Sequence, residues 1–175
     1  MTEEPPSTGL AGRELVINVR VEDPEWGGSL PNPEALIERA AGTALRHAGE
    51  TEAVELSLVL VDDDFMKELN GRFRGQDKAT NVLSFGDLEP RPESPRQVPW
   101  LLGDVVLARQ TVEREAAAQA KSMNDHVIHL VVHGVLHLLG FDHESEPEAR
   151  AMERLEVAVL AELGIADPYR CEAAQ

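Results

Sequence analysis

Residues 122–143, SMNDHVIHLVVHGVLHLLGFDH, are the most informative part of the sequence. They hold five of the six histidines of the chain, and their apolar residues recur at the spacing of a helix with one buried face. Ser122 and Asp125 resemble a capping box at the start, and Gly140 suits a left-handed turn at the end. The stretch therefore predicts a buried helix that ends sharply near Gly140.

The histidines of this helix are arranged in a row. Four of them follow one another at intervals of 3, 4 and 4 residues and so share one face: His126, His129, His133 and His137. The opposite face is apolar and is expected to lie in the core: Val127, Val131, Val135 and Leu138. A row of imidazoles on a buried helix predicts a metal site rather than a solvated surface.

Three of the histidines have a spacing known from metal sites. A turn at Gly140 can bring His143 back over the end of the row, which completes the pattern His-x3-His-x5-His with His133 and His137. This is the ligand spacing of metzincin metalloproteases. His129 and His137 are separated by about 12 Å along a helix, so both do not easily reach one ion. We expect His133, His137 and His143 to bind a single metal ion.

The donor set also indicates which ion and which chemistry to expect. Three neutral imidazole nitrogens suit zinc, and nickel, cobalt and copper fit the same donor type. Three protein ligands leave one position open, which is typical of a catalytic zinc site. Metalloproteases of this spacing have a glutamate as general base after the first histidine, where this chain has Gly134. Phosphodiester cleavage has a different requirement, because the metal and nearby cations must neutralise developing charge on oxygen, and it predicts a protein cation near the metal.

The rest of the chain predicts an α+β fold. We expect a single mixed sheet of about four strands packed with helices, with the histidine segment as a zincin-like central helix. Strands are predicted at residues 15–21, 55–61, 81–85 and 104–107. Further helices are predicted at residues 34–47, from 62 to a stop at Gly71, at 109–120 and at 145–163, with loops at 26–33 and at the proline-rich 90–99. Three parts are expected: a flexible N-terminal extension (1–13), one catalytic metal-binding domain (14–165) and a C-terminal tail (166–175).

Composition and charge limit the partners. The 175 residues carry a formal net charge of −16, which argues against nucleic-acid binding through overall positive charge. Residues 66–143 are nearly neutral and contain the basic cluster of Arg72, Arg74 and Lys78. The single cysteine, Cys171, excludes an intrachain disulfide, and neither a secretory signal nor a membrane-spanning apolar stretch is visible. We expect a cytoplasmic protein with no membrane partner.

Three blocks of the sequence resemble the YbeY family of bacterial metal-dependent endoribonucleases. These blocks are FRGQDKATNVLSF at 73–85, LGDV at 102–105 and HGVLHLLGFDH at 133–143. The resemblance implies a single-strand-specific endoribonuclease that matures ribosomal RNA, chiefly the 3′ end of the small-subunit RNA, and acts in ribosome quality control. It also implies single-stranded or ribosomal RNA, the ribosome and ribosome-associated proteins as partners. The chain departs from the family pattern at Gly86, where proline is usual, and in its long proline-rich loop.

The resemblance implies roles for individual residues. By matching position, His133, His137 and His143 would be the zinc ligands of the catalytic site, and Arg74 would be the functional arginine that holds substrate phosphate. Ser84 matches a motif position and Lys78 is a cation just before a strand, so both are substrate-binding candidates.

Two alternative functions remain open from the sequence. One is a metalloprotease-like hydrolase that takes its base from elsewhere, for example Asp142. The other is a non-catalytic ribosome assembly factor whose metal is structural and is closed by a fourth protein ligand.

Overall fold

A computed structural model describes residues 15–50, 52–86 and 99–169 of the chain. Its centre is a four-stranded mixed sheet in the order β1-β2-β4-β3, in which β1, β2 and β4 are parallel and β3 is antiparallel to β4. The strands are β1 (Leu15–Val21), β2 (Val54–Val61), β3 (Val82–Gly86) and β4 (Trp100–Ala108). The predicted α+β class with one mixed sheet is confirmed. The extension predicted at 1–13 and nearly all of the proline-rich loop fall outside the described residues.

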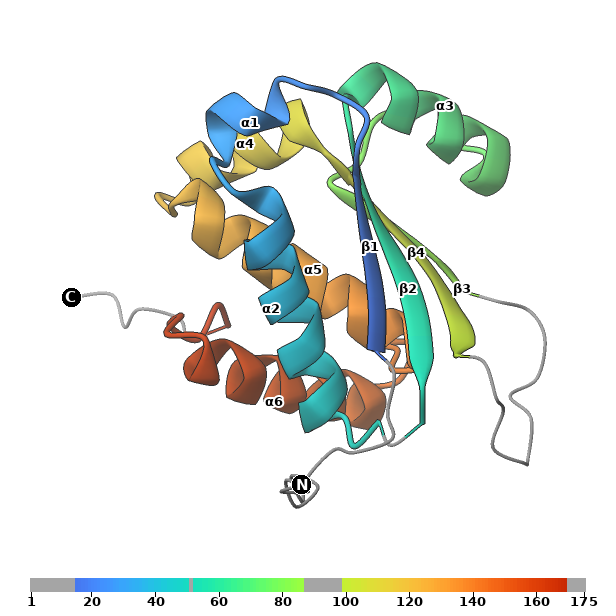
Figure 1. The fold of residues 1–175 in the computed structure, drawn as a ribbon, viewed down its shortest axis with the longest axis vertical. Helices are drawn as coiled ribbons and strands as arrows, with labels where there is room; N and C mark the ends of the chain where they lie inside the picture. Colours follow the sequence, from blue (N-terminus) through green and yellow to red (C-terminus); the bar gives the residue numbers. More distant parts are fainter. Residues whose placement is uncertain (1–14, 51, 87–98, 170–175) are drawn as a thin grey trace, which may run out of the picture.

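Six helices surround this sheet in the described part of the chain (Figure 1). They are α1 (Trp26–Ser29), α2 (Pro33–His47), α3 (Asp63–Arg74), α4 (Arg109–Ala118), α5 (Met123–Leu138) and α6 (Glu146–Glu162). Helix α5 packs against α2, α6 and strands β3 and β4, so it is the central helix of the layer on one side of the sheet. Within the described ranges, no helix combines the length and the apolar character needed to cross a bilayer.

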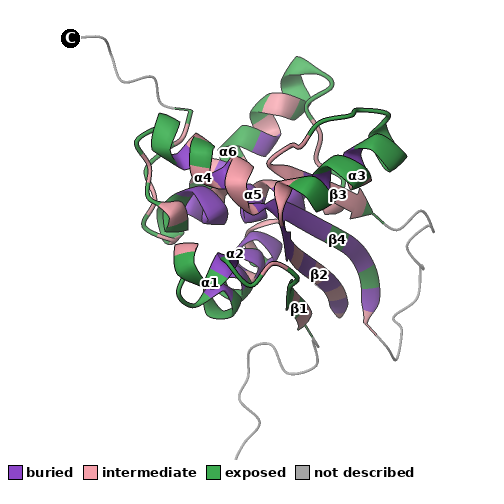
Figure 2. Ribbon diagram, turned by 90° about the horizontal axis from the view of Figure 1, so that it is seen from above, coloured by how far each residue is buried: buried purple, intermediate pink, exposed green. Residues whose placement is uncertain are grey.

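Strand residues alternate between two apolar layers, as the pleat of a sheet requires. On β4, Val105 and Leu107 belong to the main core under α2, α5 and α6, whereas Val106 and Ala108 belong to a smaller cluster under α3. Helix α3 therefore covers the opposite face of the sheet from α5. Figure 2 shows the result: α5 and the central strands are largely buried, and α3 is largely exposed.

Two predicted boundaries were wrong, and a glycine lies close to each of them. Helix α3 does not stop at Gly71 but continues to Arg74, and it is Gly75 that takes the left-handed conformation, with a φ of 66°. Strand β4 begins at Trp100 rather than at residue 104, and it passes through Gly103. A Cβ at Gly103 would lie 2.0 Å from the carbonyl oxygen of Phe85, so only glycine allows this close approach of two strands.

The other differences are smaller. The predicted loop at 26–33 contains the short helix α1, where the buried Trp26 ring donates a hydrogen bond to the Val61 carbonyl oxygen at 2.9 Å. Helix α4 ends at Ala118 rather than at residue 120. Its side chains Val112 and Ala116 are buried.

Candidate metal centre and adjoining pocket

Local sequence explains how the histidine helix begins and ends. The Ser122 hydroxyl accepts a hydrogen bond from the Asp125 backbone N–H at 3.1 Å, as the predicted cap requires. At the other end Gly140 has a φ of 97°, and the Phe141 N–H bonds to the Leu136 carbonyl at 3.1 Å. The predicted turn is thus confirmed, and it reverses the chain toward the histidine row.

The turn brings the three expected ligands together. His133, His137 and His143 each offer a ring nitrogen, and these atoms all lie within 4.8 Å of one another. The Nε2 atoms of His133 and His137 are 3.0 Å apart. Two nitrogens bound to one tetrahedral zinc at 2.0–2.1 Å would be separated by about 3.3 Å, so this geometry fits such an ion closely.

The electrostatics of the cluster favour a neutral ring at His137. Burial lowers the pKa of His137, and the neighbouring rings of His133 and His143 lower it further. A histidine binds a metal through an unprotonated nitrogen, so a depressed pKa keeps this nitrogen available at neutral pH.

The cluster holds three donors and not four in the part of the chain that the structure describes. Asp142 lines the same pocket as these histidines, but it is not one of the donors, and its carboxylate accepts a hydrogen bond from the His143 backbone N–H at 2.7 Å. Three protein ligands with an open side are the arrangement of a catalytic metal site.

The remaining histidines of the helix have other partners. The Nε2 atom of buried His126 lies 2.8 Å from the Glu115 carboxylate, and that of His129 lies 3.2 Å from the Glu156 carboxylate. Neither belongs to the metal cluster, as expected from the helical spacing.

Glu156 is a residue of the site that the sequence analysis missed. It lies on α6 with 1% of its surface exposed, and one carboxylate oxygen is 2.6 Å from Nδ1 of His133. Burial favours the protonated acid, but hydrogen bonds from His129, His133 and Tyr169 outweigh this effect and lower the pKa of Glu156 to about 2. The available signal was an acidic residue within the apolar row of α6, which also holds Met152, Val159 and Leu160.

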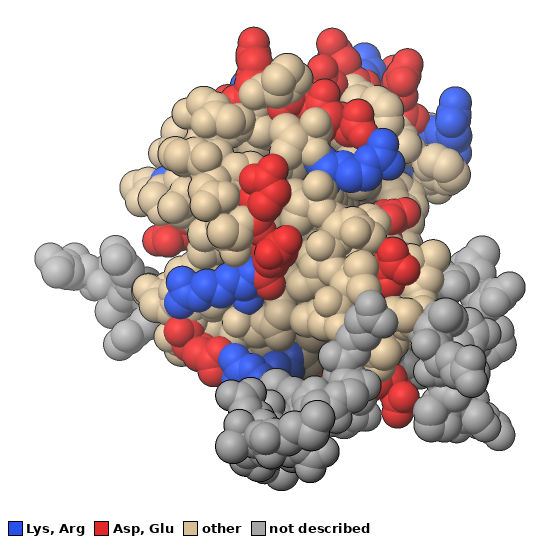
Figure 3. Space-filling view, in the orientation of Figure 1, with Lys and Arg blue, Asp and Glu red and all other residues tan. Residues whose placement is uncertain are grey.

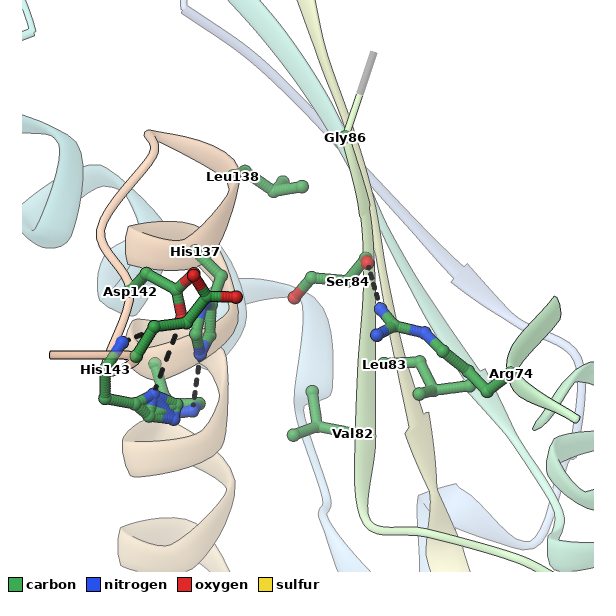
Figure 4. Close-up of a pocket in the computed structure, with 11 residues that line it drawn as sticks. Arg74, Val82, Leu83, Ser84, Gly86, His137, Leu138, Asp142 and His143 are labelled. Carbon is green, nitrogen blue, oxygen red and sulfur yellow. Dashed lines mark hydrogen bonds and ion pairs between the residues drawn. The ribbon is translucent and has the colours of Figure 1, made fainter. Parts of the chain in front are cut away.

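The histidines open into a pocket of about 490 Å³ that is also lined by residues of α3 and β3 (Figure 4). Arg74 lines this pocket, and its Nη2 donates a hydrogen bond to the Ser84 carbonyl oxygen at 3.3 Å. The Ser84 hydroxyl points the other way and donates to the Gly134 carbonyl at 3.1 Å. Figure 4 shows β3 between Arg74 and the histidines, so the guanidinium does not touch the cluster in this arrangement.

Lys78 is placed differently from the other predicted substrate-binding residues. Its side chain is exposed and does not line the histidine pocket. Its backbone carbonyl accepts a hydrogen bond from the Asn70 side chain at 2.8 Å, which anchors the segment between α3 and β3. A substrate-binding role for Lys78 stays a prediction.

The structure also explains the glycine that replaces the protease glutamate. A Cβ at Gly134 would lie 2.7 Å from Cγ1 of Val105 and 3.2 Å from the Ser84 hydroxyl, because α5 packs tightly on the sheet here. A glutamate at this position would point into β4 rather than into the pocket. Glycine at position 134 therefore allows α5 to pack closely against the sheet.

The charged side chains of the surface and of the pocket do not favour a polyanionic ligand overall. Figure 3 shows acidic side chains dispersed over one face of the molecule among fewer basic ones. The pocket itself is lined by Asp142 and Glu144 as well as by Arg74. A polyanionic ligand would therefore have to be attracted by local contacts.

Comparison with known proteins shows which family this chain belongs to. A family model described as Endoribonuclease YbeY matches residues 22–164. Proteins named Endoribonuclease YbeY include one from Rhodospirillum rubrum, 52% identical over 155 residues (82% of this chain, 76% of the relative), and one from Rhizobium johnstonii, 46% identical over 167 residues (89% and 94%). The solution structure of a Thermotoga maritima protein is similar with a TM-score of 0.51 and 25% identity, covering 89% of this chain and 100% of that one. The chain belongs to the YbeY endoribonuclease family.

Proposed function

We propose that this protein is a zinc-dependent endoribonuclease that cleaves single-stranded RNA in the pocket between α5, β3 and α3. The observation that carries the proposal is the convergence of three histidine nitrogens within 4.8 Å beside a pocket lined by Arg74. Its biological substrate is ribosomal RNA, chiefly the 3′ end of the small-subunit RNA, and it acts in ribosome quality control. This role places it in the cytoplasm with the ribosome as its partner, and residues 14–165 form the catalytic domain.

His133, His137 and His143 would hold the zinc ion. When bound, zinc supplies positive charge that polarises a phosphoryl oxygen and acidifies water. The depressed pKa of His137 keeps its ring neutral, with one nitrogen unprotonated, at neutral pH, and the exposure of His143 leaves one side of the cluster open to substrate.

Arg74 contributes the cation that phosphodiester cleavage requires. Its guanidinium is held at the pocket wall by a neutral carbonyl, Ser84 O, at 3.3 Å. A phosphate oxygen is a stronger acceptor for arginine than a carbonyl, so a bound substrate would recruit this group. Ser84 lines the same wall, and its hydroxyl, which donates to the Gly134 carbonyl at 3.1 Å, would exchange this acceptor for a phosphate oxygen to bind substrate. Lys78 meets the RNA outside the pocket.

The net charge of −16 has a consequence for substrate choice. Binding to naked RNA depends on cations that displace counterions, and here the whole protein repels a polyanion. We expect weak, salt-sensitive binding to arbitrary RNA and slow cleavage of it. Efficient cleavage requires the RNA to be presented by ribosomal partners.

The two alternatives, a metalloprotease-like hydrolase and a ribosome assembly factor with a structural metal, are less well supported. Gly134 has no space for the base of a metalloprotease, although Asp142 lines the pocket. A structural metal would need a fourth ligand, and the described residues bring no fourth donor to the cluster.

The proposal is tested with a labelled single-stranded RNA and three variants of the full chain. Arg74→Ala should slow cleavage about 100-fold or more, the typical effect of removing a group that stabilises transition-state charge. His137→Ala should abolish cleavage and zinc binding. Arg72→Ala removes a neighbouring exposed arginine of the same helix and should leave cleavage unchanged. Parental rates in folded Arg74→Ala and His137→Ala variants would refute the proposal, as would cleavage of casein but not of RNA.

A further inference from the structure

The buried carboxylate of Glu156 links His133 of the histidine cluster to His129 and to Tyr169. Glu156 receives contacts from His129 and His133 on α5 and from the hydroxyl of Tyr169, which follows α6 near the C-terminus. With 1% of its surface exposed, this side chain has exchanged water for these three partners. A buried acid is tolerated only when it is well hydrogen-bonded, so the arrangement is specific.

We propose that Glu156 is the positioning residue that sets the orientation and tautomer of His133 for metal binding, and that Tyr169 in turn fixes Glu156. This inference rests on the metal site of the proposed function. It assigns a role to residues outside the three-histidine ligand set.

The tautomer follows from hydrogen-bond chemistry. An ionised carboxylate only accepts hydrogen bonds, so the His133 Nδ1 atom 2.6 Å from Glu156 must carry the proton. In the neutral ring that binds a metal, the other nitrogen, Nε2, is then unprotonated, and it is the atom that faces His137 Nε2 at 3.0 Å. A carboxylate behind a histidine ligand fixes the ring and increases the basicity of the nitrogen that binds the metal.

The carboxylate itself is held at both oxygens. His133 occupies Oε1, whereas His129 and the Tyr169 hydroxyl both contact Oε2. The Tyr169 ring also packs edge-on against His129, with 5.9 Å between ring centroids. Glu156 therefore cannot rotate without losing contacts on two sides, which keeps the acceptor for His133 in place.

Glu156 acts through His133 and does not bind the metal directly. It contacts the Nδ1 side of the ring, away from the Nε2 atom that faces His137, and it is not part of the three-donor group among the described residues. The Asp142 carboxylate lies 4.0 Å from Nδ1 of His143, which is too far for a hydrogen bond like the one between Glu156 and His133.

The test measures the zinc affinity of metal-free full-length protein by competition with a chromophoric chelator. Glu156→Gln keeps the shape of the side chain but removes the charge, and it should weaken zinc binding about 10- to 100-fold. Tyr169→Phe removes only the hydroxyl and should give a smaller loss. Glu38→Gln makes the same change at an exposed position of α2 and should have no effect. The cobalt(II) absorption spectrum should change in Glu156→Gln and not in Glu38→Gln, which a purely structural role does not predict.

The outcomes separate this inference from the proposed function. If the parent binds zinc tightly and folded Glu156→Gln binds it equally well, the positioning role is refuted and the metal site stands. If the folded parent does not bind zinc, the proposed function fails as well. Should Glu156→Gln not fold, long-range nitrogen-15 NMR spectra of metal-free parent decide: a proton on Nδ1 of His133 supports the role, and a proton on Nε2 overturns it.

Discussion

The close packing of α5 against the sheet beside the histidine cluster is most easily tested at Gly134. In Gly134→Ala the new methyl would lie 2.7 Å from Cγ1 of Val105, which is far below van der Waals contact. Val105 is fully buried, and its β-branched side chain has few other rotamers available. The helix or the strand must therefore shift.

The expected change in the free energy of unfolding of Gly134→Ala is the sum of two opposing effects. Overpacking a core typically costs about 1–3 kcal/mol. Replacing glycine by alanine inside a helix gains about 1 kcal/mol. We expect Gly134→Ala to lower the free energy of unfolding by about 1 kcal/mol, and Gly42→Ala to raise it by up to about 1 kcal/mol, because its Cβ would meet only Leu15 at 3.8 Å.

The assay is urea unfolding of metal-free protein, arranged as a double-mutant cycle. Val105→Ala alone should cost about 2 kcal/mol through the cavity it leaves. In the double variant the methyl at residue 134 occupies part of that cavity, so the combined loss should be smaller than the sum by about 1 kcal/mol. Additive effects, or a Gly134→Ala variant stabilised as much as Gly42→Ala, would refute the packing argument.

Three further predictions concern stability. Trp26→Phe removes the donor to the Val61 carbonyl in a fully buried setting and should lower the unfolding free energy by about 2 kcal/mol, measured in urea; an unchanged midpoint would contradict this. For Asp23, burial raises the pKa, but the hydrogen bond from Arg109, the hydrogen bond from the Glu25 backbone N–H and the charge of Arg109 together outweigh it and leave the pKa below 3.8. The contribution of Asp23 to stability is therefore present above about pH 4 and lost as the pH falls further. Asp23→Asn should show a flatter loss of stability between about pH 5 and 3 than the parent, and parallel curves would refute the coupling. Chelation should lower the thermal midpoint of zinc-loaded protein and zinc should restore it, whereas an unaffected midpoint would speak against binding to the native state.

The histidine site was largely predictable because its signals are local. Histidine spacing, the Ser122 cap and the turn at Gly140 all lie within one helix and its ends, where helical geometry determines which side chains meet. Glu156 was not predictable in the same way. It meets His133 across 23 residues of sequence, and only the packing of α6 on α5 brings the two together.

Glycines limited the prediction of boundaries. Gly71 and Gly75 are equally suited to end a helix by residue type, and only the positive φ of Gly75 shows which one does so. The choice matters for function, because it places Arg74 in the last turn of α3, within reach of β3.

The central claim is that one divalent metal ion is bound by His133, His137 and His143, and elemental analysis of gently purified protein tests it most directly. His143 is 46% exposed at its side chain, so His143→Ala should fold like the parent. We predict about one zinc ion per chain in the parent and a large loss in His143→Ala. Equal metal content in both proteins, or a folded parent that takes up no zinc when it is supplied, would contradict the account.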